Sequence, residues 1–274
     1  MMSQRTVTGL LLGLAALVLL WIGGTVLSIA AAVMICVGLY EEFHALAQAG
    51  HRPVSWPTGV SVALVIPVVL AGGVEAMLPL MIGVCLVTLV CIIFRREPRL
   101  EDVAMSLLPL FTVLLPGMCV ISIIQVWPRP LQLTLLALLI VVPCVGDILA
   151  MQVGTLVRGP KLCPAVSPNK TISGAIGGLC GSLVAAIVVG IVAAILCKSD
   201  ARALLPPWWE YLILGLLGGA ISQLGDLCFS LIKRHCGIKD FSNLFPGHGG
   251  MLDRLDSILF MALVVFCYYL LVYI

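Results

Sequence analysis

The chain has 274 residues, of which 61% are hydrophobic and 10% are charged, and its formal net charge is +2. A soluble domain carries roughly 25% charged residues, so this composition excludes an ordinary soluble protein. Backbone polar groups in lipid must be satisfied within the segment that carries them, which makes long apolar runs helical. The runs are too continuous for barrel strands, in which apolar residues alternate. We therefore predict an all-α polytopic membrane protein.

Nine apolar segments follow one another along the chain, and most are near the roughly 20 residues that cross a hydrocarbon core. Residues 1–23 resemble a signal peptide, but no small-residue cleavage site follows, so a retained span is expected. The first two segments can also form one bent hairpin, and the third is short. Residues 41–50 are amphipathic and are expected to extend the second helix along the interface. The expected segments are 6–23, 25–40, 60–73, 78–94, 104–126, 131–157, 172–196, 208–232 and 258–274.

The basic residues are distributed unevenly between the two sides of the membrane. With nine spans, one side carries twelve of the fifteen Lys and Arg residues, and the other carries Arg129, Lys198 and Arg202. Lys and Arg are enriched in cytoplasmic loops, so the richer side is expected to be cytoplasmic. The predicted localisation is therefore a bacterial inner (cytoplasmic) membrane, in one integral-membrane domain. About four spans fall in an N-terminal region, 1–103, and the polar motifs fall in a catalytic region, 104–274.

The 27 residues from Ser230 to Asp256 are densely polar in an otherwise apolar chain. Charges and glycines that cluster at a membrane boundary are typical of a site for a charged ligand. The eleven cysteines form no CxxC pair, so apolar packing is expected of them rather than metal binding. The polar residues of this window include Lys233, Arg234, His235, Lys239, Asp240, His248, Asp253, Arg254 and Asp256, with a turn at Pro246, Gly247, Gly249 and Gly250.

Two aspartates, Asp147 and Asp226, lie within apolar segments. A carboxylate at the centre of a spanning helix costs about 2.5–3.5 kcal/mol on insertion scales, so such residues usually face a cavity or a partner. For Asp147, an ion pair with Arg158 is the alternative. For Asp226, a function is favoured over interhelical hydrogen bonding. Asp226 shares a helical face with Ser222, Gln223, Ser230 and Lys233.

The loop before residue 172 adds Ser167, Lys170 and Thr171 at the start of a helix, where free N–H groups favour phosphate. Carboxylates hold Mg²⁺ against substrate phosphates. Lys and Arg neutralise charge on a transferred phosphoryl group, and glycines let the backbone approach closely. Asp253 and Asp256 share a face if the last helix begins near them. These parts together predict phosphate chemistry.

The polar window resembles the signature of the phosphatidate cytidylyltransferase family, also called CDP-diacylglycerol synthases. The matching pattern is Ser230-x-x-Lys233-Arg234, Lys239-Asp240, and Pro246-Gly247-His248-Gly249-Gly250-x-x-Asp253-Arg254-x-Asp256. Asp147, the 167–174 segment and Gln223-x-Gly225-Asp226-Leu227 also resemble the family, whereas the first five segments match only in hydrophobic character. The chain departs from the family at Asn169, Ser173 and Met151, where lysine, an acidic residue and tyrosine are common.

The resemblance implies a nucleotidyltransferase of phospholipid biosynthesis, which transfers CMP from CTP to phosphatidic acid and releases pyrophosphate. It further implies Mg²⁺, a second monovalent cation such as K⁺, membrane lipid as a partner, a homodimer, and no nucleic acid. Asp226 and Asp253 are the implied metal ligands, with Asp256 as outer support. The implied catalytic residues are Asp226, Lys233, Arg234, Lys239, Asp240, Asp253, Arg254 and Asp256. The implied substrate-binding residues are Ser167, Lys170, Thr171, Ser230, His248, Gly249 and Gly250.

No general base is assigned, because a phosphate monoester with a second pKa of about 6 is already largely ionised near neutrality. His248 is expected to orient the glycine turn or to contact phosphate, and His235 has no assigned role. The alternatives are an ion-coupled transporter that uses the intramembrane aspartates and a CTP-dependent lipid kinase, which would release CDP. A cytidylyltransferase that acts on another lipid phosphate is a third.

Overall fold

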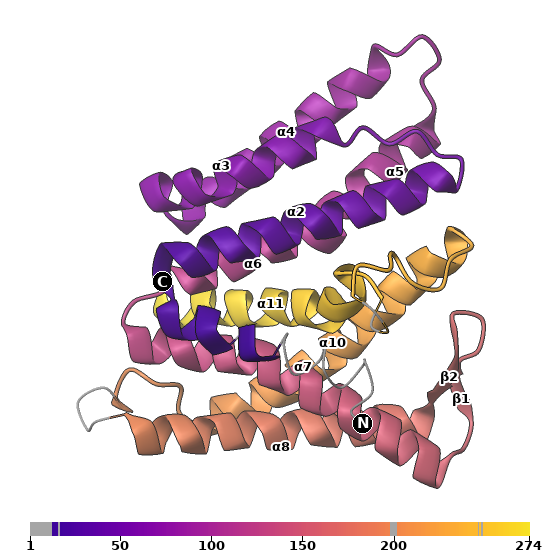
Figure 1. Ribbon diagram of the computed structural model, residues 1–274. Coiled ribbons are helices and arrows are strands. Elements are labelled where there is room, and N and C mark those ends of the chain that lie inside the picture. The colour runs from indigo at the N-terminus through magenta and orange to yellow at the C-terminus, as the bar shows by residue number, and fades with distance from the viewer. Residues whose placement is uncertain (1–12, 16, 198–201, 246, 248) are drawn as a thin grey trace. The chain divides into compact units, whose positions relative to one another are not determined.

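The computed structural model describes residues 13–15, 17–197, 202–245, 247 and 249–274 (Figure 1). The chain forms two compact units. Unit 1 comprises the chain up to Ile124 together with Lys233–Leu255, and unit 2 comprises Gln125–Ile232 and Asp256–Ile274. Helices dominate both units. The division at residues 103 and 104 stays a prediction, because it follows sequence motifs rather than packing.

Seven helices in the described part of the chain are long and apolar enough to cross a membrane. They correspond to the second and the fourth to ninth expected segments, which confirms a polytopic all-α membrane protein. The third expected segment forms a shorter helix of 17 residues. Much of the first lies outside the described residues, so the count of nine spans stays a prediction. The seven helices are Gly24–Gln48, Val74–Ile93, Leu100–Ile124, Arg129–Val157, Ile172–Leu196, Trp208–His235 and Leu252–Tyr273.

Unit 1 is built from consecutive helices in the N-terminal part of the chain. Within the span Leu100–Ile124, Pro116 has no N–H to donate to the carbonyl four residues earlier, and a π-helical turn precedes it. The elements are α2 (Gly24–Gln48), α3 (Trp56–Gly72), η1 (Val74–Ala76), α4 (Met77–Ile93), α5 (Leu100–Pro109), η2 (Leu110–Leu114) and α6 (Leu115–Ile124).

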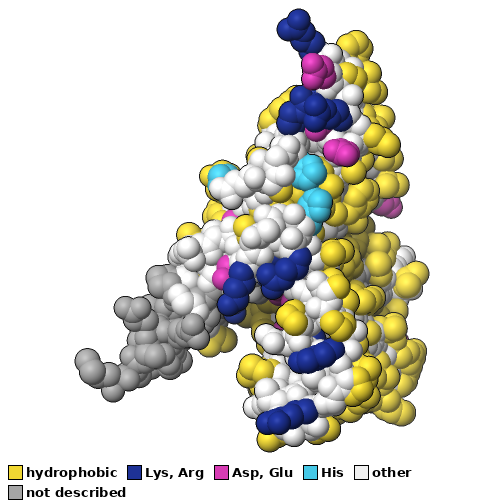
Figure 2. All heavy atoms as spheres, turned by 90° about the vertical axis from the view of Figure 1, so that its right-hand side faces the viewer, with side chains coloured by type: hydrophobic (Ala, Val, Ile, Leu, Met, Phe, Trp, Pro, Cys, Tyr) yellow, Lys and Arg dark blue, Asp and Glu magenta, His cyan; other side chains and the backbone are white. Residues whose placement is uncertain are grey.

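Two loops of unit 1 that the sequence places on one side of the membrane lie together in the structure. Arg52 and Arg95 both donate to Oδ2 of Asp102, at 3.1 and 3.2 Å. Arg95 also donates to the backbone carbonyl of Arg52. Figure 2 shows exposed basic, acidic and histidine side chains bordered by apolar side chains. Which side of the membrane the loops of Arg52 and Arg95 meet stays a prediction.

The expected extension of the second helix is confirmed, because α2 runs without interruption to Gln48. Its expected position along the membrane interface stays a prediction, whereas the structure shows that its two acids are buried within the protein. Glu41 is 4% exposed and Glu42 is fully buried. Hydrogen-bond donors from other parts of the chain hold both carboxylates in the interior.

In unit 2, two helices pack closely together, and a two-stranded hairpin leads into the N-terminus of the second helix. α7 and α8 approach closely at glycines, as is usual between membrane helices. A Cβ at Gly174 would stand 2.8 Å from the carbonyl oxygen of Ala150. The hairpin pairs Lys161 with Thr171, and Thr171 caps α8 by accepting from Gly174 N at 3.1 Å. The elements are α7 (Arg129–Val157), β1 (Lys161–Cys163), β2 (Ser167–Thr171) and α8 (Ile172–Leu196), with most of α10 (Trp208–His235) and α11 (Leu252–Tyr273).

Candidate functional site

The polar window of unit 1 is an irregular loop that connects the end of α10 to the start of α11. The Arg234 guanidinium donates to the carbonyl of Ile238 at 3.2 Å and closes the end of α10. The predicted glycine turn is present, because Phe245 N donates to Gly249 O at 2.9 Å. Gly247 and Gly249 have φ of 74° and 82°, which favours glycine. Pro246 and His248 lie outside the described residues, so the role of His248 stays a prediction.

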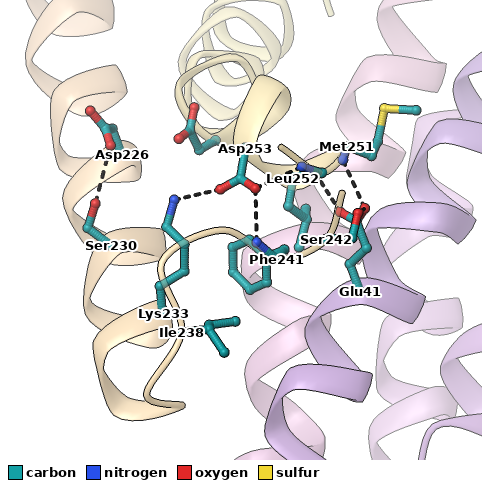
Figure 3. Close-up of polar contacts among 12 residues, drawn as sticks. Glu41, Asp226, Ser230, Lys233, Ile238, Phe241, Ser242, Met251, Leu252 and Asp253 are labelled. Atoms are coloured by element: carbon teal, nitrogen blue, oxygen red, sulfur yellow. Dashed lines mark hydrogen bonds and ion pairs between the residues drawn. The ribbon is translucent and has the colours of Figure 1, made fainter. Parts of the chain in front are cut away.

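Asp253, in the first turn of α11, is the central acceptor of this loop (Figure 3). Its Oδ1 accepts from Lys233 Nζ at 2.7 Å. Its Oδ2 accepts from the backbone amides of Phe241 and Gly250, both at 2.9 Å. A carboxylate offers about four lone-pair positions, so most are already used. Asp253 thereby connects the end of α10, the loop and the glycine turn to the start of α11.

The Lys233–Asp253 ion pair is buried, and each residue is 9% exposed. The ammonium of Lys233 also lies 5.5 Å from the ring centroid of Phe241. Removing one partner of a buried pair leaves an uncompensated charge, which typically costs about 3–5 kcal/mol. The pair therefore contributes strongly to holding the loop in this conformation.

Four other charged residues predicted in the window are exposed, whereas Asp256 is half-buried. This set provides cationic groups that water-borne phosphates can reach, and an acid beside them. It comprises Arg234, Lys239, Asp240 and Arg254. The structure thus separates the predicted charges of the signature into a buried pair and an exposed group.

Glu41 is a second carboxylate that holds the same loop, and sequence reasoning did not select it. Its Oε1 accepts from Ser242 Oγ at 2.6 Å and from Met251 N at 2.9 Å, and its Oε2 accepts from Leu252 N at 2.8 Å (Figure 3). Its signal in the sequence is an acid that continues an apolar run, as with Asp147.

In unit 2, Asp226 on α10 forms an ion pair with Lys170 on β2. The side chains of Asp226 and Lys170 are 25% and 28% exposed. Ser230, one turn further along α10, donates to Asp226 Oδ1 at 3.4 Å, which is a weak bond. The structure therefore brings three of the predicted residues together and leaves the Asp226 carboxylate accessible.

Asp147 and Asp256 meet at Ser257. The Ser257 hydroxyl donates to Asp147 Oδ2 at 2.9 Å, and its backbone amide donates to Asp256 Oδ1 at 2.8 Å. Asp147 thus has a partner on α11, which is the kind of contact expected of an acid in an apolar helix. The predicted helix start near Asp253 is confirmed, since α11 begins at Leu252.

The other predicted residues between α7 and α8 have contacts within the protein, as does Gln223 of α10. Ser167 is half-buried in β2, and Thr171 is buried as the cap of α8. Ser173, where the chain departs from the family pattern, donates to the carbonyl of Arg158. Gln223 of the polar α10 face donates to the carbonyl of Ala175 on α8 at 3.1 Å, which is an interhelical bond.

Within the described residues, no three His, Cys, Asp or Glu side chains are grouped as a metal site. Mg²⁺ does not need such a group, because it commonly binds one or two carboxylates, water and substrate phosphates. Asp226 fits this mode, since its accessible carboxylate has one strong and one weak partner. Asp253 has few positions left and fits as a ligand through one oxygen.

Comparison with known proteins finds relatives that match nearly the whole chain. The chain is 32% identical to a Synechocystis sp. protein, over 97% of this chain and 96% of that protein, and 31% identical to a Bacillus subtilis protein, over 98% and 97%. Both are named phosphatidate cytidylyltransferase. A Brucella abortus protein of the same name is 36% identical over 140 residues, and the match spans about half of its length, 48%.

A family model supports the same relationship over nearly the entire chain. The model described as the cytidylyltransferase family matches residues 3–272. Since this match and two relatives above 30% identity cover the chain almost from end to end, the chain belongs to the cytidylyltransferase family.

Proposed function

We propose that this protein transfers CMP from CTP to phosphatidic acid, giving CDP-diacylglycerol and pyrophosphate. The observation that carries the proposal is the similarity, over nearly the full length, to two proteins named phosphatidate cytidylyltransferase. The polar loop between α10 and α11 supports it, because it carries exposed cations together with a buried Lys–Asp pair. The helices supply a membrane location where a lipid substrate is available.

In the proposed reaction, an oxygen of the lipid phosphate attacks the α-phosphorus of CTP. A new P–O bond forms there, and the bond to the oxygen that bridges toward the β-phosphorus breaks. Pyrophosphate leaves with that electron pair. The nucleophile is already largely ionised near neutrality, because the second pKa of a phosphate monoester is about 6. The protein therefore has to position two anions and to neutralise their charge.

The cations of the loop are suited to this task. Arg234, Lys239 and Arg254 are exposed and would bind oxygens of the triphosphate or of the lipid phosphate. Lys233 would act from a fixed position, because Asp253 holds its ammonium group. In unit 2, Lys170 is available if a substrate phosphate replaces Asp226 as its partner.

We propose that Asp226 and Asp253 are ligands of Mg²⁺, with Asp256 as outer support of the metal site. A bound Mg²⁺ would supply positive charge to the phosphate oxygens. Asp226 would contribute an accessible carboxylate on α10, and Asp253 one oxygen at the start of α11. A monovalent cation such as K⁺ is part of the same proposal. Ser167, Thr171, Ser230, Gly249 and Gly250 are proposed to line the substrates.

We further propose that the protein works as a homodimer in the bacterial inner membrane, with its reactive loop toward the cytoplasm. CTP is dissolved in cytosolic water, and a lipid presents its phosphate at the interface. Loops that carry Arg52 and Arg95 would lie on that side by the distribution of basic residues.

One assay tests the reaction and separates it from the alternatives. Purified protein would be incubated with Mg²⁺, phosphatidate and CTP labelled in its cytosine ring. We expect labelled CDP-diacylglycerol and an equal amount of pyrophosphate. Release of labelled CDP with a newly phosphorylated lipid would identify a kinase. Unconsumed CTP, together with cation-dependent uptake in vesicles, would identify a transporter.

A further inference from the structure

We infer that Glu41 is a positioning residue for the loop between α10 and α11. Its carboxylate holds the first turn of α11 and so orients Asp253 and Lys233. The role in catalysis rests on the proposed function, in which these two residues act on phosphates and metal. The role in holding the loop rests on geometry alone.

Glu41 caps α11 from a distant part of the chain. The first N–H groups of a helix have no partner within it, and they form the positive end of the helix dipole. Met251 and Leu252 provide two of these donors, and they follow Glu41 by 210 and 211 residues. Each carboxylate oxygen takes one of the amides, so both oxygens are needed. Glu41 is 4% exposed, which keeps water from replacing it.

The position of Gly250 matches this arrangement. A Cβ added there would stand 2.7 and 2.8 Å from the two carboxylate oxygens of Glu41. Real Cβ atoms do not approach so closely, so a larger residue would displace the carboxylate or the loop. From the sequence, we expect this glycine to let the backbone approach a substrate closely. The structure adds a second reason, because the Glu41 carboxylate occupies the space that a side chain would need.

Glu41 and Asp253 together hold the same two stretches of the loop. In the first stretch, Asp253 binds Phe241 N and Glu41 binds the Ser242 hydroxyl. In the second, residues 250–252, Asp253 binds the first amide and Glu41 the next two. Since Asp253 also binds Lys233, a shift at Glu41 would move the predicted metal ligand and its cation together. A displacement of about 1 Å from reacting groups can cost about a hundredfold in rate.

The variant Glu41→Gln tests the inference, with Glu42→Gln as the matched control. The two α11 amides bind different oxygens of the Glu41 carboxylate, so glutamine would set its own NH₂ group against one of these donors. Glu42 is the adjacent buried carboxylate, but its oxygens accept from Thr112 Oγ1 of η2, at 2.9 and 3.0 Å, rather than from the amides of α11. Hydrogen exchange of residues 241–252, thermal unfolding, kcat, KM for CTP and the Mg²⁺ dependence would be measured.

We expect Glu41→Gln to speed exchange at Met251 and Leu252, to lower kcat about tenfold or more, and to raise the Mg²⁺ concentration needed for half-maximal rate. Glu42→Gln should leave loop exchange and the Mg²⁺ dependence near those of the unsubstituted protein. Unchanged exchange at Met251 and Leu252 in Glu41→Gln would overturn the inference. So would a loss of rate that follows thermal stability alone, with an unchanged Mg²⁺ dependence.

A second variant, at Gly250, tests the contact between Glu41 and the loop without changing Glu41 itself. Gly250→Ala should reproduce the fast exchange and the lower kcat, because its methyl group would displace Glu41. Gly250→Ala combined with Glu41→Ala should be little worse than Glu41→Ala, since residues in contact are non-additive. Fully additive losses would contradict the contact. Absence of CMP transfer in the unsubstituted protein would instead overturn the proposed function, and exchange would still decide the role of Glu41.

Discussion

Asp253 in unit 1 and Asp226 in unit 2 belong to the same predicted set of metal ligands, yet their surroundings differ. Asp253 is 9% exposed and accepts three hydrogen bonds, one of them from a buried lysine. Asp226 has a side chain that is 25% exposed, paired with the equally accessible Lys170, and accepts a weak bond from Ser230. One carboxylate is embedded in its loop, and the other is open.

The two acids therefore differ in how easily each can change its bonding partner. Breaking a buried pair leaves a charge without solvent, whereas water reaches Asp226 and Lys170 in part and lowers the contribution of their pair. Asp226 can therefore exchange its lysine for another cation at low cost. Asp253 cannot exchange its donors without disturbing the loop. Four groups of substitutions can break or sharpen this comparison.

The largest effect is expected for Asp226→Asn and Asp253→Asn. Both should abolish CMP transfer if both carboxylates bind Mg²⁺. Asp253→Asn should in addition lower the free energy of unfolding by about 3–5 kcal/mol, since Lys233 would lose its buried counter-charge. Asp226→Asn should unfold near the temperature of the unsubstituted protein. Activity and thermal unfolding in detergent check both statements. Equal destabilisation by the two variants would contradict the comparison, and near-normal activity in either would remove the metal assignment.

The lysine partners should repeat the contrast. Lys233→Met removes the charge that neutralises Asp253 and should destabilise the protein strongly, with loss of activity. Lys170→Met should change the free energy of unfolding by about 1 kcal/mol or less, while raising KM for a phosphate-bearing substrate. Thermal unfolding and steady-state kinetics measure both. If Lys170→Met were the more destabilising change, the accessible pair would be structural after all.

A smaller effect is expected at Gly249. Its φ is +82°, and an added Cβ would stand 2.8 Å from Asp253 Oδ2. Gly249→Ala should cost about 1–2 kcal/mol through the left-handed backbone alone, and should lower kcat because Asp253 must move. Gly237→Ala is the matched control, since Gly237 has φ +69° with nothing within 4 Å of an added Cβ. Equal loss of kcat in both variants would show that backbone strain, rather than Asp253, is responsible.

The smallest effect on stability is expected for the exposed cations. Lys239→Ala and Arg254→Ala should change the free energy of unfolding by about 0.5 kcal/mol or less. Both should raise KM for CTP, and more so at low ionic strength, where charge attraction is less screened. Measuring KM across a salt series tests this. A KM that is independent of salt in both variants would remove these residues from the phosphate site.

Much of the helical framework could be predicted from the sequence. The expected segment 172–196 coincides with α8, and the segment 131–157 begins within two residues of α7. The hairpin of β1 and β2 was missed, because two short polar strands show no apolar alternation. The burial of Glu41 and Glu42 was missed as well, because helical periodicity places a residue on a face but does not say what packs against that face.

The sequence alone determined that the chain is a set of membrane helices, since long apolar runs must satisfy their own backbone in lipid. It also determined which residue types gather for phosphate chemistry, because the signature is local and its spacing is read directly. Only the tertiary structure decided the partners. Lys233 pairs with Asp253, Lys170 with Asp226, and Glu41 with the start of α11. These contacts join residues 20 to 211 positions apart, and such pairings depend on the path of the chain through space rather than on any local pattern.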